Sequence, residues 1–246
     1  MQIKNRKYSI IVFLLTLFVF NTSLKADEFN ITAKEVTIDK ENEVIVGKGS
    51  VIAEDSEGKI INANKITYKK SRNFLLAEGK VKVIDIEGNI LTANKVTYDK
   101  INEIITTYGY TQLIFKEGYK VITKNILYNI RKKILNSNND SVFTDNDGNK
   151  VETSMFQYHI KNSVFSSVGK IKIIDIKKNK YFLKELHVDT KSNEMIGSDI
   201  SVILDQESFG VSEENDPRFV ANDILITDTK TDLSKGVFTV CKKRDG

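Results

Sequence analysis

The stretches INANKITYKK (residues 61–70) and LTANKVTYDK (residues 91–100) are nearly the same sequence, and they lie thirty residues apart. The spacing continues along the chain. Six consecutive thirty-residue units occupy residues 31–210, a polar spacer VSEENDPR follows at 211–218, and a partial seventh unit runs over 219–246. Self-similarity at a fixed period of this size is the sequence signature of a repeat architecture. We therefore predict a stack of equivalent structural units.

Each unit is predicted to be a β-hairpin, because its two runs of residues alternate between apolar and polar side chains. In the third unit, Val96 and Tyr98 alternate with Lys95, Thr97 and Asp99. A period of two is typical of a strand with one dry face. Acidic residues followed by Gly, as in DSEGK, DIEGN and DNDGN, suit the turns that close each hairpin. Two turns of about four residues leave about eleven residues for each strand, which is longer than usual.

Small residues in the middle of these long strands predict a bend. Gly in mid-strand commonly marks a bulge or a sharp turn of the chain. One place in the period holds Gly, and the partner strand has a small residue at its own midpoint: Gly49, Gly79, Gly109 and Gly169, with Ala33, Ala63, Ala93 and Ala221. We predict that every hairpin folds across its middle. The predicted fold class is thus all-β, with long bent antiparallel strands that form two facing sheets joined along a crease.

The stack also predicts columns of apolar side chains inside the folded sheet, because equivalent positions of successive units lie above one another. The predicted interior lining is Val36, Ile38, Ile66, Tyr68, Val81, Val83, Val96, Tyr98, Leu113, Ile126, Tyr128, Phe143, Phe156, Tyr158, Ile171 and Ile173. The same period adds Ile203 to one column. Such columns have two interpretations: a core with a purely structural role, or the lining of an elongated apolar trough. The tyrosines favour the trough slightly, because their rings suit a rim that is apolar inside and wet outside.

The first 26 residues have the three parts of a secretory signal peptide. A basic start (1–7) precedes a run of largely apolar residues (8–20), and NTSLKA ends at Ala26, after which we predict cleavage. The apolar run is short for a membrane span, although an uncleaved anchor is the alternative. The leader holds four of the 37 Lys and Arg residues and none of the 33 acidic residues, so the mature chain is formally neutral. Nucleic acid is therefore not a predicted partner.

The sequence offers little for catalysis, and we predict no enzyme activity, no cofactor and no metal. The two histidines, His159 and His187, lie on predicted strands of different units without a third ligand at a metal-binding spacing. The stretch TDNDGNKVE (144–152) hints at a calcium loop. Such a loop needs Gly and Glu where this chain has Lys150 and Phe156, so a hairpin turn is the better interpretation.

The strand pattern A-N-K-V-T-Y-D together with A-E-G-K-V-K-V resembles the OstA-like domain shared by periplasmic lipopolysaccharide-transport proteins. The resemblance covers residues 27–241, which is nearly the whole of the predicted mature domain at 27–246. It implies an open, folded-over β-jellyroll whose apolar interior shelters the acyl chains of lipopolysaccharide, in the periplasm and associated with the outer membrane. The implied partners are lipopolysaccharide and other OstA-like domains, joined through exposed edge strands. A structural or adhesive β-solenoid without lipid cargo is the alternative function.

Within this family, the segment at 219–246 resembles the junction in the outer-membrane assembly protein LptD, where a cysteine near the end of the periplasmic domain pairs with one in the barrel. Cys241, the single cysteine of the chain, is the matching position. The resemblance implies a disulfide whose partner is absent, a chain that is a fragment of a longer protein, and partnership with an outer-membrane β-barrel and its lipoprotein plug. A lone cysteine in an exported protein is also compatible with a free thiol. A free-standing bridge protein of the LptA type is the alternative.

Overall fold

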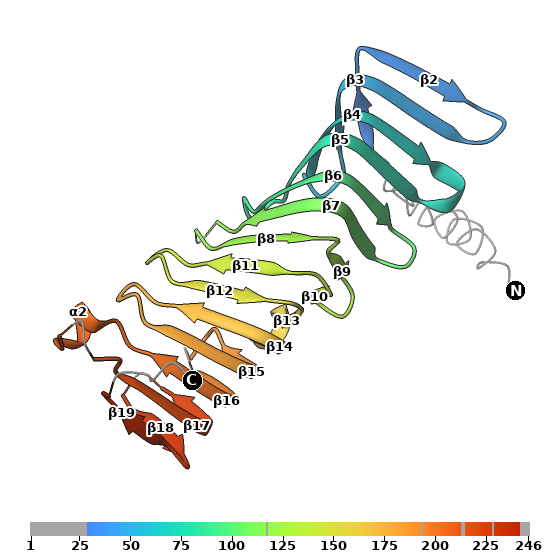
Figure 1. Cartoon of the computed structure of the whole chain (residues 1–246). Helices are drawn as coiled ribbons and strands as arrows, with labels where there is room; N and C mark the ends of the chain where they lie inside the picture. Colours follow the sequence, from blue (N-terminus) through green and yellow to red (C-terminus); the bar gives the residue numbers. More distant parts are fainter. Residues whose placement is uncertain (1–28, 117, 193, 213–214, 228, 242–246) are drawn as a thin grey trace, which may run out of the picture.

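The computed structural model describes residues 29–241 except residues 117, 193, 213–214 and 228. The predicted leader, residues 1–26, lies outside the described residues. Nineteen strands of the described chain form one continuous antiparallel sheet. Figure 1 shows the hairpins stacked side by side into an elongated, twisted body with the first and last strands at opposite ends. The predicted fold class, an open folded-over β-jellyroll built from long bent antiparallel strands, is confirmed.

Long strands flank a middle region of short ones. The first part of the stack contains β1 (Asn30–Thr32), β2 (Glu35–Asp39), β3 (Val44–Glu54), β4 (Ile60–Lys69), β5 (Phe74–Ile84), β6 (Ile90–Asp99) and β7 (Ile104–Ile114). The middle contains β8 (Lys120–Lys124), β9 (Leu127–Asn129), β10 (Ile134–Ser137), β11 (Ser141–Thr144), β12 (Lys150–Thr153) and β13 (Phe156–His159). The last part contains β14 (Val164–Ile174), β15 (Lys180–Asp189), β16 (Glu194–Ile203), β17 (Arg218–Ile226), β18 (Thr231–Ser234) and β19 (Val237–Thr239). Short helical turns in the connections are η1 (Lys70–Arg72), η2 (Ile160–Asn162) and α2 (Gln206–Phe209).

The alternation of apolar and polar residues explains which face each strand buries. In β6, Ala93, Val96 and Tyr98 are buried, whereas Lys95 and Thr97 between them are more exposed. The strands β3, β5, β7 and β14 have 11 residues each, and β4, β6 and β15 have 10. The predicted strand length of about eleven residues is therefore confirmed for these strands, and it is wrong for β8 to β13, where the strands stop at the bend and have three to five residues.

A bulge bends the long strands near their middle. Between β5 and β6 the pairing shifts register between Glu78 and Val81, and the two residues in between, Gly79 and Lys80, have φ of 76° and 49°. An extra residue in one strand of a pair bends that strand, and Gly adopts the positive φ at its first position without a steric penalty. The same shift occurs in β3 and β14. The bend predicted from the glycines is confirmed, and it is visible in β5 to β7 of Figure 1.

The sixth unit departs from the period by one residue. Strand β16 crosses the crease with a single residue at positive φ, Asp199, where β3 and β5 have two. The missing residue reverses the alternation beyond the crease, so that Val202 is buried and Ile203 is 44% exposed. The predicted place of Ile203 in an interior column is therefore wrong, because a change of phase by one residue moves a side chain to the opposite face of a strand.

Hydrogen bonds between successive turns fasten the units together along one edge of the stack. The Asp85 side chain accepts a hydrogen bond of 2.8 Å from the N–H of Asn89, which closes the turn. The Asn89 side-chain oxygen then accepts one of 3.0 Å from the N–H of Lys116 in the next unit. Asn149 and Asn179 make the equivalent bonds to the turns that follow them. The acidic turn residues thus hold their own turns, and the asparagines beside them hold the neighbouring turns.

Apolar side chains on the inner face of the folded sheet form two clusters. The first cluster runs from Phe29 to Tyr98, and the second runs from Leu113 to Ile224. Leu91 packs against both. The apolar interior therefore extends along the whole described stack, and its buried part is divided near β7.

The polar spacer does not interrupt the sheet. Strands β16 and β17 lie on either side of it and pair antiparallel from Met195↔Ile226 to Ile203↔Arg218. The partial seventh unit therefore continues the stack. The predicted limits of the domain, residues 27–246, stay a prediction.

Candidate functional site

Most of the predicted interior lining lies in the two apolar clusters. The buried members are Ile66, Tyr68, Val81, Val96, Tyr98, Leu113, Ile126, Phe156 and Ile171. Val83, Tyr128, Phe143, Tyr158 and Ile173 are half-buried and pack against the same clusters. The structure therefore brings these side chains together from successive units, and it packs them closely against one another. Their role in binding lipid stays a prediction.

Two predicted lining residues lie apart from the others. Val36 is 45% exposed and Ile38 is 60% exposed. Both are in β2, which pairs only with β3 in the described chain, so no further unit covers them. The period alone does not show that this column ends in solvent at β2.

One column of tyrosines lies where the apolar interior meets polar turns. The Tyr68 hydroxyl donates a hydrogen bond of 3.0 Å to the side-chain oxygen of Asn73, and the Tyr158 hydroxyl lies 3.2 Å from that of Thr190. Burial, followed by two nearby acidic side chains, raises the pKa of the Tyr128 hydroxyl. The rings therefore form part of an apolar wall, and the hydroxyls form a polar rim beside it.

Buried hydroxyl groups occupy the inner side of the crease in the middle of the stack. They belong to Thr107, Thr111, Thr123, Ser137, Ser141, Thr153 and Ser167. The sequence analysis missed them, although the thirty-residue period held the signal. Residues 107, 137 and 167 are the equivalents of Ala77, and residues 111 and 141 are the equivalents of Val81. A line of small polar residues at core positions was therefore readable before the structure.

These hydroxyls bond to one another and to main-chain carbonyls. Thr123 Oγ1 lies 2.7 Å from Ser141 Oγ and 3.1 Å from Ser137 Oγ. Ser137 donates to the carbonyl of Lys124 at 2.8 Å, and Ser141 donates to that of Asn139 at 2.7 Å. Among the described residues, no buried side-chain polar atom lacks a hydrogen-bond partner. The line of hydroxyls is thus a satisfied structural network.

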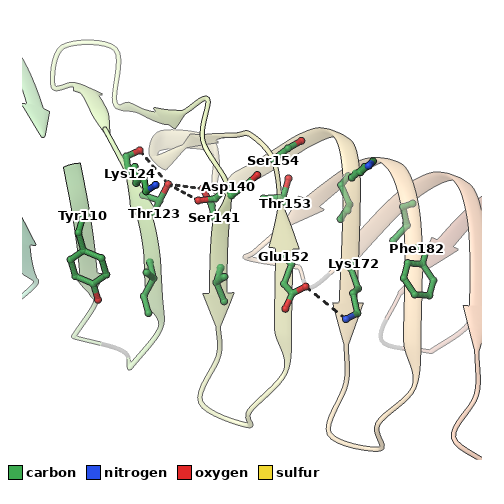
Figure 2. Close-up of a pocket in the computed structure, with 15 residues that line it drawn as sticks. Tyr110, Thr123, Lys124, Asp140, Ser141, Glu152, Thr153, Ser154, Lys172 and Phe182 are labelled. Carbon is green, nitrogen blue, oxygen red and sulfur yellow. Dashed lines mark hydrogen bonds and ion pairs between the residues drawn. The ribbon is translucent and has the colours of Figure 1, made fainter. Parts of the chain in front are cut away.

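A groove of about 710 Å³ crosses strands β7, β8, β11, β12, β14 and β15. Figure 2 shows Tyr110, Glu152, Lys172 and Phe182 along this groove, each on a different strand. Their neighbours in sequence, such as Thr111, Thr153 and Leu183, are buried on the inner face. Because successive side chains of a strand point to opposite faces, these groove residues lie on the outer face of the sheet.

The groove also borders buried residues of the inner face, namely Thr123, Ser141, Thr153, Ile171 and Leu183, of which Ile171 belongs to the predicted lining of the trough. The sequence analysis did not find this groove. Equivalent positions in three successive units are Ile122, Glu152 and Phe182, so the repeat gives no consistent residue type there.

Charges in the groove are matched to one another. Lys150 Nζ lies 2.5 Å from one carboxylate oxygen of Glu152, and Lys172 Nζ lies 3.8 Å from the other. The hydrogen bond from Lys150, with the positive charges of both lysines, lowers the pKa of Glu152. A carboxylate that is neutralised in this way is poorly suited to act as a general base near neutral pH.

The histidines have structural partners on their own or neighbouring strands. His159 Nε2 lies 2.9 Å from Gln157 Oε1, and His187 Nδ1 lies 3.0 Å from Ser166 Oγ. Within the described residues, no group of three or more His, Cys, Asp or Glu side chains is arranged to hold a metal ion. Cys241 is exposed, with a free thiol. No helix in the described part of the chain is both long and apolar enough to cross a membrane.

Comparisons with known proteins give a limited result. No protein-family model matches the chain, and no curated protein matches it. Solved structures do match, and one of them is LptH from Pseudomonas aeruginosa, described as the LptA-homologous periplasmic component of a lipopolysaccharide transport device. The match has 14% sequence identity and a TM-score of 0.20, and it covers 69% of this chain and 80% of LptH. A TM-score this low does not establish a shared fold, so membership of the OstA-like family stays a prediction from the sequence motif.

Proposed function

We propose that this protein is a periplasmic lipopolysaccharide carrier or bridge that shelters acyl chains inside its folded sheet during transport to, and assembly in, the outer membrane. The apolar inner face of the folded sheet is the observation on which the proposal rests. Apolar columns extend along the stack on the inner face of one bent sheet, and they repeat at every unit. Near-equivalent positions let an acyl chain move from unit to unit with little change in free energy. The OstA-like motif supports lipopolysaccharide as the cargo.

Burial of apolar surface supplies the binding free energy. Each Å² of acyl surface that leaves water contributes about 25 cal/mol, so a few hundred Å² contribute several kcal/mol. The polar head group stays outside the open side of the fold, beside the tyrosine hydroxyls. The protein performs no chemical step, and supply of cargo from upstream drives the movement.

The close packing of the interior sets a condition on this mechanism. Ile66, Tyr68 and Phe156 are almost fully buried against their neighbours. An acyl chain therefore enters only when the two faces of the folded sheet move apart. Hinge motion at the crease is the simplest way to separate them, because the crease is the line that joins the two faces.

The ends of the stack support the proposed partners. Strand β2 pairs only with β3, and β18 and β19 pair only with β17, among the described residues. Strands with an unpaired side accept a strand of another protein. Leu233, Val237 and Phe238 are exposed at the C-terminal end and add apolar surface for such a contact. We propose that further OstA-like domains pair at these ends.

Cys241 supports the finer assignment to an LptD-like protein. The thiol is exposed and its main-chain oxygen accepts a hydrogen bond of 2.6 Å from Arg218. The Cys241 thiol is therefore accessible for a disulfide with a cysteine of an outer-membrane barrel. In that arrangement the lipoprotein plug of the barrel would lie near the C-terminal end of the stack. In an LptA-type bridge the same thiol would stay free.

Two tyrosines provide a matched test of the proposed function. A photoreactive benzoyl-phenylalanine replaces either Tyr128, on the inner rim, or Tyr108, which is exposed beside the buried Thr107. We expect irradiation in a lipopolysaccharide-producing host to attach lipopolysaccharide at position 128 and not at 108, with native mass spectrometry identifying the bound mass. Equal attachment at both positions, or attachment at neither, would contradict the proposal.

The packed interior favours a second candidate function, a structural or adhesive β-solenoid. In this case the apolar columns are core and nothing else. This candidate predicts that the purified protein carries no lipid and that neither tyrosine position forms an adduct.

A further inference from the structure

Phe29 belongs to the first apolar cluster although it precedes the first repeat unit. Its side chain is only 5% exposed. The positions one to five periods later are polar or rim-type turn residues: Lys59, Asn89, Tyr119, Asn149 and Asn179. Phe29 is therefore an addition to the repeat pattern, and that pattern does not explain why an aromatic ring is buried there.

The Phe29 ring occupies the tyrosine-lined part of the interior. Its centroid lies 5.3 Å from that of Tyr68 and 6.3 Å from that of Tyr98, with interplanar angles of 76° and 81°. Both contacts are edge-to-face, which is a favourable geometry for aromatic pairs. Phe29 thus contacts two residues of the predicted lipid-binding lining.

Cationic side chains lie beside these rings. Lys100 Nζ is 5.1 Å from the Phe29 centroid, and Lys59 Nζ is 5.2 Å from the Tyr98 centroid. Lys59 also forms an ion pair of 3.2 Å with Asp55. An apolar group with an ammonium next to it has the composition of a site for an anionic amphiphile.

A short strand holds Phe29 in place. Strand β1 has three residues and, within the part of the chain that the structure describes, pairs only with β3, from Asn30↔Glu54 to Thr32↔Ile52. Short edge elements with few contacts open at lower free energy than the core does. The ring can therefore leave the interior without disruption of a long strand.

We propose that Phe29 occupies an acyl-chain site in the empty protein, and that the chain of an anionic amphiphile displaces it while the acidic head group binds Lys100. This inference rests on the proposed carrier function. It assigns a point of entry near β1 and a ligand class, acyl-chain amphiphiles with a phosphate or carboxylate head. The buried ring keeps this part of the interior dry until cargo arrives.

The absence of tryptophan from the sequence allows a direct test. Phe29→Trp places a single fluorescent reporter in the interior, and Tyr108→Trp places one on the outer face as a control. The probe is dodecyl phosphate, and calorimetry measures its binding independently. We expect binding to move the emission of the Phe29→Trp variant to longer wavelength and to increase its quenching by acrylamide at least about twofold, with no change in the Tyr108→Trp variant.

The outcomes separate the two proposals. Binding of dodecyl phosphate by calorimetry without a change in the Phe29→Trp emission would overturn the displacement of Phe29 and leave the carrier function standing. An absence of binding in every variant would overturn both.

Two further variants test occupancy and the head-group contact. When a site is open in only a fraction of the molecules, its apparent affinity is reduced in proportion to that fraction. Removal of the ring should leave the site open, so we expect Phe29→Ala to bind dodecyl phosphate about threefold more tightly. We expect Lys100→Gln to weaken dodecyl phosphate severalfold and to leave the uncharged dodecyl maltoside unchanged. Weaker binding by Phe29→Ala would show that the ring is part of the core, and equal effects of Lys100→Gln on both amphiphiles would exclude the head-group contact.

Discussion

The crease of this sheet is built in two different ways. In β3 to β6 the strands run through the bend, with Gly at positive φ in the bulges of β3 and β5 and apolar residues such as Ala77 and Val81 inside. In the middle of the stack the strands stop at the bend, so that β8 and β9, β10 and β11, and β12 and β13 are separate. There the inner positions carry hydroxyl groups.

The difference follows from the hydrogen bonds of the main chain. A continuous strand pairs its carbonyls with the neighbouring strand, so an apolar residue suffices at the bend. Where a strand stops, carbonyls such as those of Lys124, Asn139 and Met155 lose their place in the ladder. Ser137, Ser141 and Ser167 donate to these carbonyls. Hydroxyl side chains offer the main chain an alternative to sheet pairing, so they suit a crease where a strand or its neighbour stops, as Thr107 of β7 does beside the break between β8 and β9.

The largest effect should come from removing the central hydroxyl of the broken crease. Thr123→Val keeps the shape of the side chain but deprives two serines of a buried partner. We expect a loss of about 2–3 kcal/mol in the free energy of unfolding, because buried polar groups are left unsatisfied. Urea denaturation measures it. A loss below about 0.5 kcal/mol would mean that the hydroxyl network does not stabilise the crease.

Alanine substitutions at two glycines compare the steric demands of the continuous crease with those of a turn. An added Cβ at Gly79 would lie 2.7 Å from the Asn64 side-chain nitrogen, whereas nothing lies within 4 Å at Gly148. Both have positive φ, 76° and 96°. We expect Gly79→Ala to lower stability by about 2 kcal/mol and Gly148→Ala by about 1 kcal/mol, since only the first adds a steric conflict to the backbone strain. Equal losses in thermal unfolding would show that strain alone decides.

A hydroxyl placed in the continuous crease should destabilise it. Ala77 is fully buried, and β5 already pairs its main chain with β4 and β6. We therefore expect Ala77→Ser to lower the free energy of unfolding by about 1–2 kcal/mol. The reverse exchange, Thr107→Ala, is the matched control and should also destabilise, because the N–H of Ile126 donates to the Thr107 hydroxyl. If Ala77→Ser were neutral, the two creases would be chemically interchangeable.

The smallest effect is expected at Tyr181, whose hydroxyl donates a hydrogen bond to the turn residue Asp175. This effect depends on pH, whereas the hydroxyls of the crease do not titrate. Burial first, and then the hydrogen bond to Asp175, raises the pKa of Tyr181 to about 12. In the unfolded chain the pKa of a tyrosine hydroxyl is about 10. The stabilising effect is therefore full below pH 10 and disappears as pH rises through 12. We expect Tyr181→Phe to flatten the decline of stability over this window, and an unchanged slope in alkaline denaturation curves would contradict the assignment.

The sequence was sufficient for the features that a local rule determines. Gly79 predicted the bend because few other residues adopt its backbone conformation, and Val96 predicted an inner face because strands alternate. Features that depend on neighbours were not predictable in this way. A serine such as Ser137 suits a solvated strand as well as a buried crease, and only its place in the period distinguishes the two. Phe29 lies before the repeat, so no column predicted its contacts with Tyr68 and Tyr98.

The sixth unit shows how the repeat array accommodates the loss of one residue at the crease. One residue fewer at Asp199 exchanges the roles of Val202 and Ile203, yet Phe219 and Ala221 on the next strand pair in the expected phase. The connection between them absorbs the difference. One residue fewer at the crease therefore alters the inner surface of one half-strand and leaves the phase of the next strand, β17, unchanged.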